Sequence, residues 1–172
     1  MQKYMIRNFR ISLLSAAVVV LIATAGCMKK KGCTDKNACN YDKEAGKDDG
    51  SCIKEPAGMV TAYITTSSFL NFDNGDIQGG CYGGMDMGFS PFNFYYCTYG
   101  STGIADVGKV SCLGGVTTKP SSGYASAVAT ELGHGYVVKL INNTYARVYA
   151  EEWMLSLSGG VIGIKISWQY PW

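Results

Sequence analysis

Histidine is scarce in this sequence, and several common catalytic motifs are missing. It has one histidine, His134, and it lacks the Gly-x-Ser-x-Gly turn, the His-Glu-x-x-His zinc motif, a phosphate-binding glycine loop and a Cys-x-x-Cys pair. Glu151 and Glu152 are adjacent, so on a regular strand they face opposite sides and cannot work as an acid/base pair. We therefore predict a protein that is not an enzyme.

A basic surface is also missing. The chain has 15 lysines and arginines against 13 acidic residues, and its formal net charge is +2. The basic excess comes from the N-terminal segment before Gly32. Proteins that bind nucleic acids concentrate positive charge on one face of a folded domain. Nucleic acid is therefore not an expected partner.

The N-terminal segment has the layout of an export signal. Lys3, Arg7 and Arg10 precede an uncharged run over residues 11–23, which is typical of a signal peptide. This run is shorter than the roughly 20 apolar residues that a membrane-spanning helix needs. We predict that residues 1–26 form a signal peptide, which makes the remaining chain extracytoplasmic.

The end of this signal resembles a bacterial lipobox. The sequence Thr-Ala-Gly-Cys ends at Cys27, with Thr24 where leucine is usual. The resemblance implies that the Cys27 thiol is acylated and anchors the protein to a membrane, with residues 27–31 as a basic spacer. The alternatives are a free Cys27 after an ordinary signal peptide, or an uncleaved anchor.

The spacer also bears on the location of the protein. Met28 is not the aspartate that retains lipoproteins at the inner membrane, so we expect lipid anchoring at the outer membrane. Lys29, Lys30 and Lys31 stand where some lipoproteins carry the acidic residues that promote surface display. Whether the protein faces the periplasm or the cell surface stays open.

Six cysteines follow Cys27, and in an exported protein an even set predicts disulfides. Three lie in the short N-terminal module and three in the remainder, so pairing within each part leaves one thiol over in each. Either Cys39 or a neighbouring cysteine forms a disulfide between the parts or two thiols are free, and 15 pairings are possible. The candidates are Cys33, Cys39, Cys52, Cys81, Cys97 and Cys112.

Residues 32–55 form a separate module that is dense in turn-forming residues and has no strand or helix periodicity. Such a segment needs covalent staples to become ordered, because it buries little apolar surface. Its sequence resembles a short repeat of exported Bacteroidota proteins, Gly-Cys-Thr-Asp-x-x-Ala-Cys-Asn-Tyr followed by Asp-Asp-Gly-Ser-Cys.

The same module contains oxygen ligands suited to calcium. Their spacing is not that of an EF-hand loop, and lysines balance their charge. We favour side chains that cap local turns and keep calcium as the alternative. The candidate ligands are Asp35, Asn37, Asn40, Asp42, Asp48 and Asp49.

Residues 56–172 have the composition of short strands joined by glycine-containing turns, which predicts an all-β module. We expect an antiparallel sandwich or meander with C-terminal hairpins that turn at Asn142-Asn143 and Gly159-Gly160. A short helix over residues 124–132 is the one competing element. The expected strands cover residues 59–66, 92–99, 104–113, 136–141, 144–150, 153–158 and 161–170.

Several segments of this module resemble the HmuY-like haem-binding lipoproteins of Bacteroidota. They are Met-Asp-Met-Gly-Phe from Met85, Gly-Ser-Thr-Gly-Ile-Ala-Asp from Gly100, Gly-Tyr-Val-Val-Lys from Gly135, Tyr-Ala-Arg-Val from Tyr145, and the strand over residues 164–170. The resemblance implies an all-β fold, and for haem it requires two axial ligands on opposite sides of the porphyrin.

The candidate haem ligands are Met85, Met87 and His134. The two methionines are expected on one face of a strand, where they cannot enclose a porphyrin from both sides. We favour core packing for the methionines and an exposed loop position for His134 over haem ligation.

Aromatic residues crowd residues 89–99, where they either fill a sandwich core, which we favour, or form an exposed patch for a partner or a sugar. The sequence thus predicts a lipid-anchored cell-envelope protein that binds an extracellular ligand, such as a protein or a glycan. The alternatives are a structural or assembly lipoprotein without a small ligand, and a haem-binding lipoprotein. No cofactor is expected beyond the calcium alternative.

Overall fold

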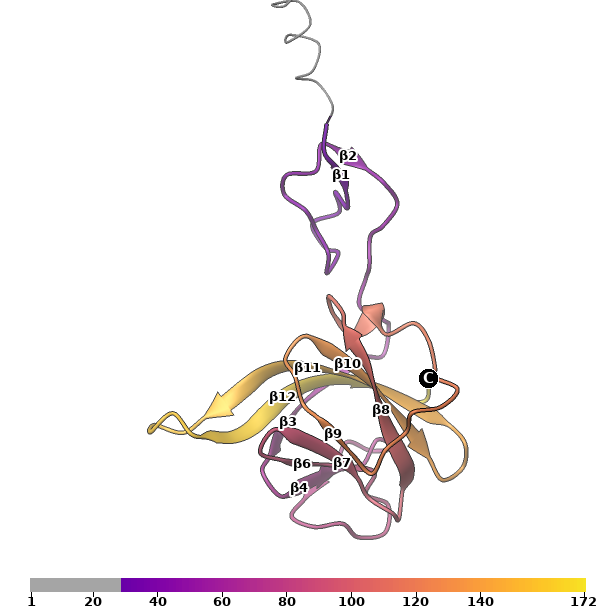
Figure 1. Cartoon of the computed structure of the whole chain (residues 1–172), viewed down its shortest axis with the longest axis vertical. Coiled ribbons are helices and arrows are strands. Elements are labelled where there is room, and N and C mark those ends of the chain that lie inside the picture. Colours follow the sequence, from indigo (N-terminus) through magenta and orange to yellow (C-terminus); the bar gives the residue numbers. More distant parts are fainter. Residues whose placement is uncertain (1–28) are drawn as a thin grey trace, which may run out of the picture. The chain divides into compact units, whose positions relative to one another are not determined.

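The computed structural model describes residues 29–172, so the predicted signal peptide and Cys27 lie outside the described residues. The described chain divides into two compact units. The small unit contains residues 29–34 and Asp42–Ser51, and the β unit contains Asp35–Tyr41 and Cys52–Trp172. Figure 1 shows the elements of both units along the chain.

This division does not follow the predicted boundary between residues 55 and 56. Asp35–Tyr41 belongs to the β unit because a disulfide joins Cys39 to Cys112. The backbone N–H of Cys39 also donates to the Ile53 carbonyl at 2.8 Å. Part of the cysteine-rich module is therefore built into the larger unit.

Regular structure in the small unit is limited to two short parallel strands, β1 (Lys31–Gly32) and β2 (Lys47–Asp48). The Lys30 ammonium contacts Asp42 Oδ2 at 2.8 Å and Glu44 Oε2 at 3.2 Å. Exposed ion pairs of this kind contribute little stability, roughly 0–1 kcal/mol. Turns dominate this unit, as its sequence predicts.

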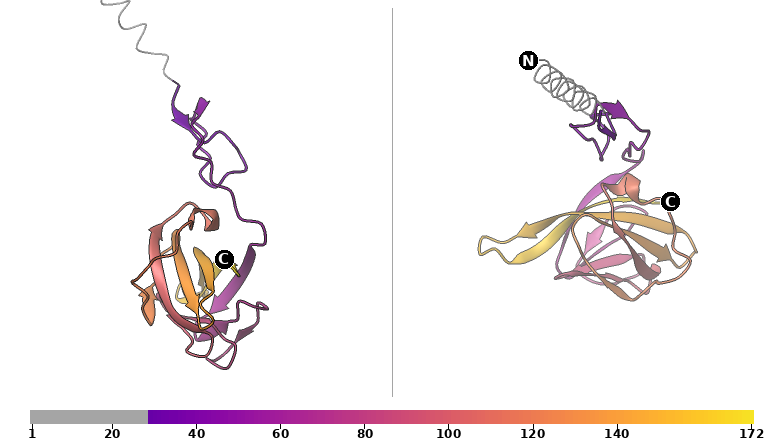
Figure 2. Two further views of the ribbon diagram at one scale, coloured as in Figure 1. Left: turned by 90° about the vertical axis from the view of Figure 1, so that its right-hand side faces the viewer. Right: turned by 45° about the horizontal axis from the view of Figure 1, so that its top comes forward.

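The β unit is a sandwich of two antiparallel five-stranded sheets, which Figure 2 shows from two further directions. The first sheet has the order β3-β12-β11-β10-β8. Its strands are β3 (Val60–Thr65), β12 (Val161–Gln169), β11 (Tyr145–Leu155), β10 (His134–Leu140) and β8 (Ser101–Lys109). The second sheet has the order β5-β4-β6-β7-β9. Its strands are β5 (Ile77–Gln78), β4 (Ser68–Leu70), β6 (Met87–Ser90), β7 (Asn93–Tyr96) and β9 (Ala127–Ala129).

The core lies between the two sheets, because alternate side chains of each strand point inward. Ile164, Ile166 and Trp168 of β12 fill it from the first sheet, as their spacing predicts. The same spacing predicts Ile162 on this face, but Ile162 is exposed near the tip of the hairpin. Aromatic rings meet there, with centroids 5.0 Å apart for Phe94 and Tyr136. The prediction of an all-β antiparallel sandwich is confirmed.

The C-terminal hairpins form where the sequence places them. Asn143 has φ 60°, a left-handed conformation that asparagine tolerates, and it turns the chain from β10 into β11. Gly159, with φ 83°, serves the turn between β11 and β12. Figure 1 shows this second hairpin, in yellow, extending beyond the rest of the β unit.

One continuous strand, β11, replaces the two strands predicted over residues 144–158. The pairing of β11 with β12 shifts between Ala150 and Glu152, so Glu151 is the extra residue of a β-bulge. Lys165 is the register partner of Glu152 and also contacts Glu151, which places both carboxylates on the same side of the sheet. The expectation that these glutamates face opposite sides was therefore wrong.

The competing helix over residues 124–132 does not form. Its middle part is β9, which pairs with β7 and completes the edge of the second sheet. Within residues 29–172 helical structure is confined to a 3-10 turn, η1 (Leu113–Gly115), at the end of a segment predicted as strand. This described part of the chain contains no helix with the length and apolar character needed to cross a membrane.

Candidate functional site

The six cysteines of the described chain are all disulfide-bonded. Cys39 pairs with Cys112, and Cys81 pairs with Cys97. The three-plus-three distribution left open whether a disulfide crosses between the two parts of the sequence or two thiols stay free. The Cys39–Cys112 disulfide is that crossing bond.

The calcium candidates are divided between the two units, with Asp35, Asn37 and Asn40 in the β unit and the other three in the small unit. The Asp35 carboxylate accepts the Asn37 N–H at 2.9 Å and contacts the Lys54 ammonium at 2.8 Å. The contact with Lys54 and then this hydrogen bond lower the pKa of Asp35. The Asn40 side chain accepts the Ile53 N–H at 2.7 Å.

The small-unit candidates act in the same way. Asp42, Asp48 and Asp49 each accept a backbone N–H two residues ahead, at 2.9, 2.9 and 3.0 Å. These are the turn-capping contacts that the sequence favoured. Calcium binding stays the alternative that the sequence left open.

The methionine candidates for haem lie in two different apolar clusters. Met87, on β6, is fully buried in the core between the sheets, whereas Met85 packs with Phe69 and Cys97 in a second cluster. Met85 precedes β6, so the strand alternation that was expected to place both methionines on one face does not apply. Both are core residues and offer no exposed sulfur.

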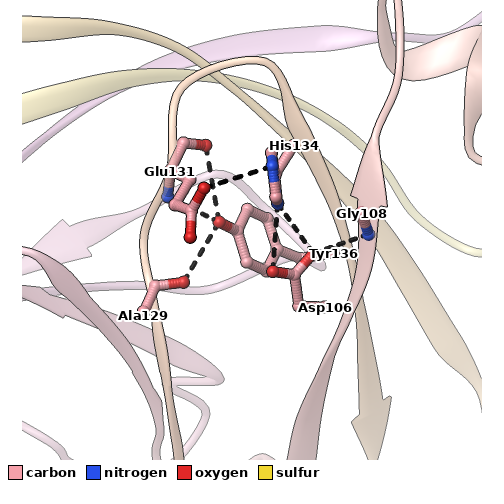
Figure 3. Close-up of polar contacts among 6 residues, drawn as sticks. All are labelled: Asp106, Gly108, Ala129, Glu131, His134 and Tyr136. Carbon is pink, nitrogen blue, oxygen red and sulfur yellow. Dashed lines mark hydrogen bonds and ion pairs between the residues drawn. The ribbon is translucent and has the colours of Figure 1, made fainter.

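His134 is the first residue of β10 and is not in an exposed loop. Figure 3 shows its ring between two carboxylates: Nδ1 lies 3.1 Å from Asp106 Oδ2 and Nε2 lies 3.3 Å from Glu131 Oε2. Its side chain is only 19% exposed. The Tyr136 hydroxyl accepts the Glu131 N–H at 2.8 Å, which holds the turn before β10 in place. Because each ring nitrogen of His134 contacts a carboxylate, neither is available to a ligand in this arrangement.

Aromatic residues of the 89–99 segment serve mainly as core, as favoured. Phe89 and Phe94 are fully buried in the core between the sheets. Phe92 and Tyr99 are exposed by 56% and 63%, and they do not form one patch with the buried rings.

A polar cleft of about 500 Å³ lies on the outer face of the first sheet, within the β unit. Its floor includes Thr61, Ser167 and Tyr149, which are register partners across three neighbouring strands, β3, β12 and β11. The remaining lining residues are Cys39, Glu55, Met59, Ser111, Cys112, Glu151 and Lys165. The volume falls within the roughly 300–1,000 Å³ of small-molecule sites.

Local geometry explains how the sequence builds this cleft. Glu151 lies on the outer face two residues after Tyr149, as regular alternation requires, and the bulge then turns Trp153 toward the core. The Cys39–Cys112 disulfide forms one wall and joins the segment around Cys39 to the loop that follows β8. The Tyr149 hydroxyl donates to the Ser111 carbonyl at 3.3 Å, which ties β11 to that wall.

On one side of the cleft, a lysine ammonium group neutralises the carboxylate of Glu151. Lys165 Nζ lies 2.6 Å from Glu151 Oε2, and this hydrogen bond raises the pKa of Lys165. The Ser167 hydroxyl donates to the other oxygen of Glu151. Glu151 is thereby held by an ammonium and a hydroxyl.

The other side is not compensated. Glu55 Oε2 accepts the Gly114 N–H at 3.3 Å, and no basic side chain of residues 29–172 forms an ion pair with Glu55. Although solvent reaches this side chain, burial by the cleft atoms raises the pKa of Glu55, and repulsion by Glu151 adds to the rise. The Gly114 hydrogen bond and the charge of Arg147 oppose it.

Sequence reasoning missed this cleft as a site. The alternation of β12 correctly places Lys165 and Ser167 on the polar face, which is the available signal. Glu55 was assigned to a different module from Glu151, and only the fold brings their charges close enough to interact.

Comparisons with known proteins give no family. No protein-family model and no curated protein matches the chain. Among solved structures, one described as a HmuY-like haem-binding protein of Bacteroides vulgatus has a TM-score of 0.48 and 14% identity, covering 70% of this chain and 96% of its own. Another, described as a lipoprotein of Bacteroides fragilis, has a TM-score of 0.45 and 11% identity, covering 70% and 94%. Likeness at this level assigns neither a family nor a ligand.

Proposed function

We propose that this chain is a non-enzymatic, lipid-anchored protein of the outer membrane whose β unit binds a small polar ligand from outside the cell. The observation that carries the proposal is the cleft on the first sheet, where Glu55 lies without a basic partner. Convergent polar groups in a concave site of this size are typical of ligand binding. An extracellular glycan or a protein segment is the partner class predicted from the sequence.

The uncompensated carboxylate favours binding over a purely structural role. A carboxylate whose pKa is raised by its surroundings destabilises the folded state whenever it is ionised. Perturbed ionisable groups in clefts are characteristic of functional sites.

Haem is not the ligand that we propose. Met85 and Met87 are buried in separate clusters, and both ring nitrogens of His134 contact carboxylates. Two axial ligands facing each other across a gap would require these residues to leave their present partners.

A screen of small polar compounds tests the cleft. Saturation-transfer NMR on the full-length lipidated protein in detergent micelles, with mono- and disaccharides, amino acids and amines, is expected to detect binding. Thr61→Trp fills the floor of the cleft and should abolish it. Thr65→Trp, also exposed on β3 but outside the cleft, is the matched control and should retain it. Equal binding by both variants would place the ligand elsewhere, and an absence of binding throughout would overturn the proposal.

The anchor has its own test. Radiolabelled palmitate is expected to label the wild-type protein and to leave Cys27→Ser unlabelled, with the wild type in the outer-membrane fraction and the variant in the soluble fraction. Equal labelling of both proteins would show that Cys27 is not the acylated residue.

A further inference from the structure

The charge of the cleft is unbalanced in a definite direction. Two carboxylates, Glu55 and Glu151, line it together with one ammonium, Lys165, so the lining carries one excess negative charge. Lys165 is engaged with Glu151, and the excess therefore resides at Glu55.

The surroundings of Glu55 sharpen this imbalance. Its carboxylate oxygen and the two sulfur atoms of the Cys39–Cys112 disulfide lie within 4.8 Å of one another. The disulfide shields part of this exposed carboxylate from water without offering it a hydrogen-bond donor. Oxidised cysteines also provide no thiolates, so this group is not a ready metal site. A cationic hydrogen-bond donor is the group that Glu55 lacks.

The rest of the lining is rich in hydroxyl groups. Thr61 and Ser111 contribute exposed hydroxyls, whereas the Tyr149 hydroxyl already donates to the Ser111 carbonyl and the buried Ser167 hydroxyl donates to Glu151. Hydroxyls donate and accept hydrogen bonds and so match a ligand that is itself hydroxylated. Ligands with a carboxylate or phosphate are disfavoured, because Glu55 repels them and Lys165 is already neutralised.

From these observations we infer that the cleft takes an aminated saccharide, whose primary ammonium group pairs with Glu55 while its hydroxyls meet the hydroxyl-rich floor. This inference rests on the proposed binding function of the cleft and specifies its ligand class. Glu55 is then the specificity-determining residue, and Glu151 with Lys165 forms the fixed polar side of the site.

The test uses disaccharides of the same shape that differ in charge. Calorimetric titrations of the lipidated protein in detergent micelles, at about pH 6 where amino groups are protonated, compare the β-1,4-linked glucosamine dimer with cellobiose and with the N-acetylated dimer. A charge-assisted hydrogen bond predicts that the glucosamine dimer binds at least about tenfold more tightly than either neutral sugar.

Two glutamine variants assign that preference. Glu55→Gln keeps the shape of the side chain and should reduce the preference to about twofold or less, with weak binding of all three sugars retained. Glu152→Gln removes a charge from the same side of the sheet outside the cleft lining, and it should leave the preference unchanged. Loss of the preference in both variants would indicate a general charge effect and overturn the assignment to Glu55.

Acidification supplies an independent readout. Because the pKa of Glu55 is raised, the affinity of the wild type for the glucosamine dimer should begin to fall at a higher pH than an ordinary glutamate would cause. Glu55→Gln should not show this loss.

The remaining outcomes separate this inference from the proposed function. If cellobiose binds as tightly as the glucosamine dimer and Thr61→Trp abolishes both, the binding function is retained but the pairing of a ligand ammonium group with Glu55 is refuted. If the glucosamine dimer does not bind but Nα-acetyl-lysine amide binds more tightly than its norleucine analogue, the ligand is not a saccharide, and a peptide with a lysine side chain is indicated. If none of these compounds binds but another member of the screen binds in the cleft, the aminated saccharide is refuted as the ligand class while the binding function is retained.

Discussion

Asp86 gives the most quantitative prediction about the β unit. Its side chain is buried, with 3% of the residue exposed, and its Oδ2 accepts the Phe72 N–H at 2.7 Å. Burial raises the pKa of Asp86 from 3.8 to about 6; the Phe72 hydrogen bond opposes this shift, and the nearby charge of Asp73 adds to it. The folded state therefore binds a proton more tightly at this residue than the unfolded chain does.

The magnitude follows from the shift. A difference of about two pKa units between 3.8 and about 6 corresponds to up to about 3 kcal/mol. For an acid with a raised pKa in the folded state, this stability is fully present below about pH 3.8 and is lost as the pH rises through about 6. The contribution of Asp86 therefore makes the protein less stable at neutral pH than near pH 4.

Urea denaturation of the wild type and of Asp86→Asn isolates this contribution. Asparagine keeps a carbonyl oxygen to accept the Phe72 N–H but does not titrate. Tryptophan fluorescence reports on the β unit alone, because Trp153, Trp168 and Trp172 all belong to it. The difference between the unfolding free energies of the two proteins cancels the contributions of Asp35, Asp42 and Asp49, whose lowered pKa values act in the opposite direction.

The expected result is a pH-dependent difference. Relative to Asp86→Asn, the wild type should lose up to about 3 kcal/mol of unfolding free energy between about pH 4 and pH 7. If the difference between the two proteins stays constant within about 0.5 kcal/mol over this range, Asp86 has an ordinary pKa and the reasoning from its burial fails.

Further predictions concern the disulfides, Gly100, the stability effect of Glu55 and calcium binding. In the chain-entropy model, replacing both cysteines of the Cys39–Cys112 disulfide by alanine should lower the free energy of unfolding by about 4 kcal/mol, as measured by urea denaturation. The same change at the shorter Cys81–Cys97 disulfide should lower it by about 3 kcal/mol, and the reverse order would contradict the model. Gly100→Ala should cost more than about 2 kcal/mol, because its methyl group would overlap a buried carboxylate and a backbone carbonyl; a variant as stable as the wild type would disprove that packing. Glu55→Gln should leave stability at neutral pH unchanged or slightly higher, and a clear loss would mean that Glu55 is structural. Calorimetric titration with calcium should give no saturable heat, whereas a heat that Asp35→Asn removes would establish calcium binding.

Local sequence patterns predicted the C-terminal half of the sandwich well. The alternation of Ile164, Ile166 and Trp168 specifies the buried face of β12, and the turn at Asn143 follows from the conformations that asparagine tolerates. Residues 124–132 show the limit of such patterns, because their apolar spacing also fits a helix. Pairing of β9 with β7 provides hydrogen bonds along a sheet edge, and this tertiary contact overrides the local preference.

Features that depend on tertiary structure were out of reach. The bulge at Glu151 depends on how β11 pairs with β12, and without it the alternation rule places Glu152 on the wrong side. The count of cysteines required either a disulfide between the two parts or two free thiols, but it did not show that Cys39 pairs with Cys112. The cleft combines residues from both ends of the chain, so no single motif contains it.

The Cys39–Cys112 disulfide also limits how far the first sheet can open. β3 and β8 are the two edge strands of this sheet; Cys39 precedes β3 along the chain, and Cys112 follows β8. The disulfide therefore closes a covalent loop that contains both edge strands. While it is intact, a local opening of the sheet cannot carry the start of β3 far from the end of β8.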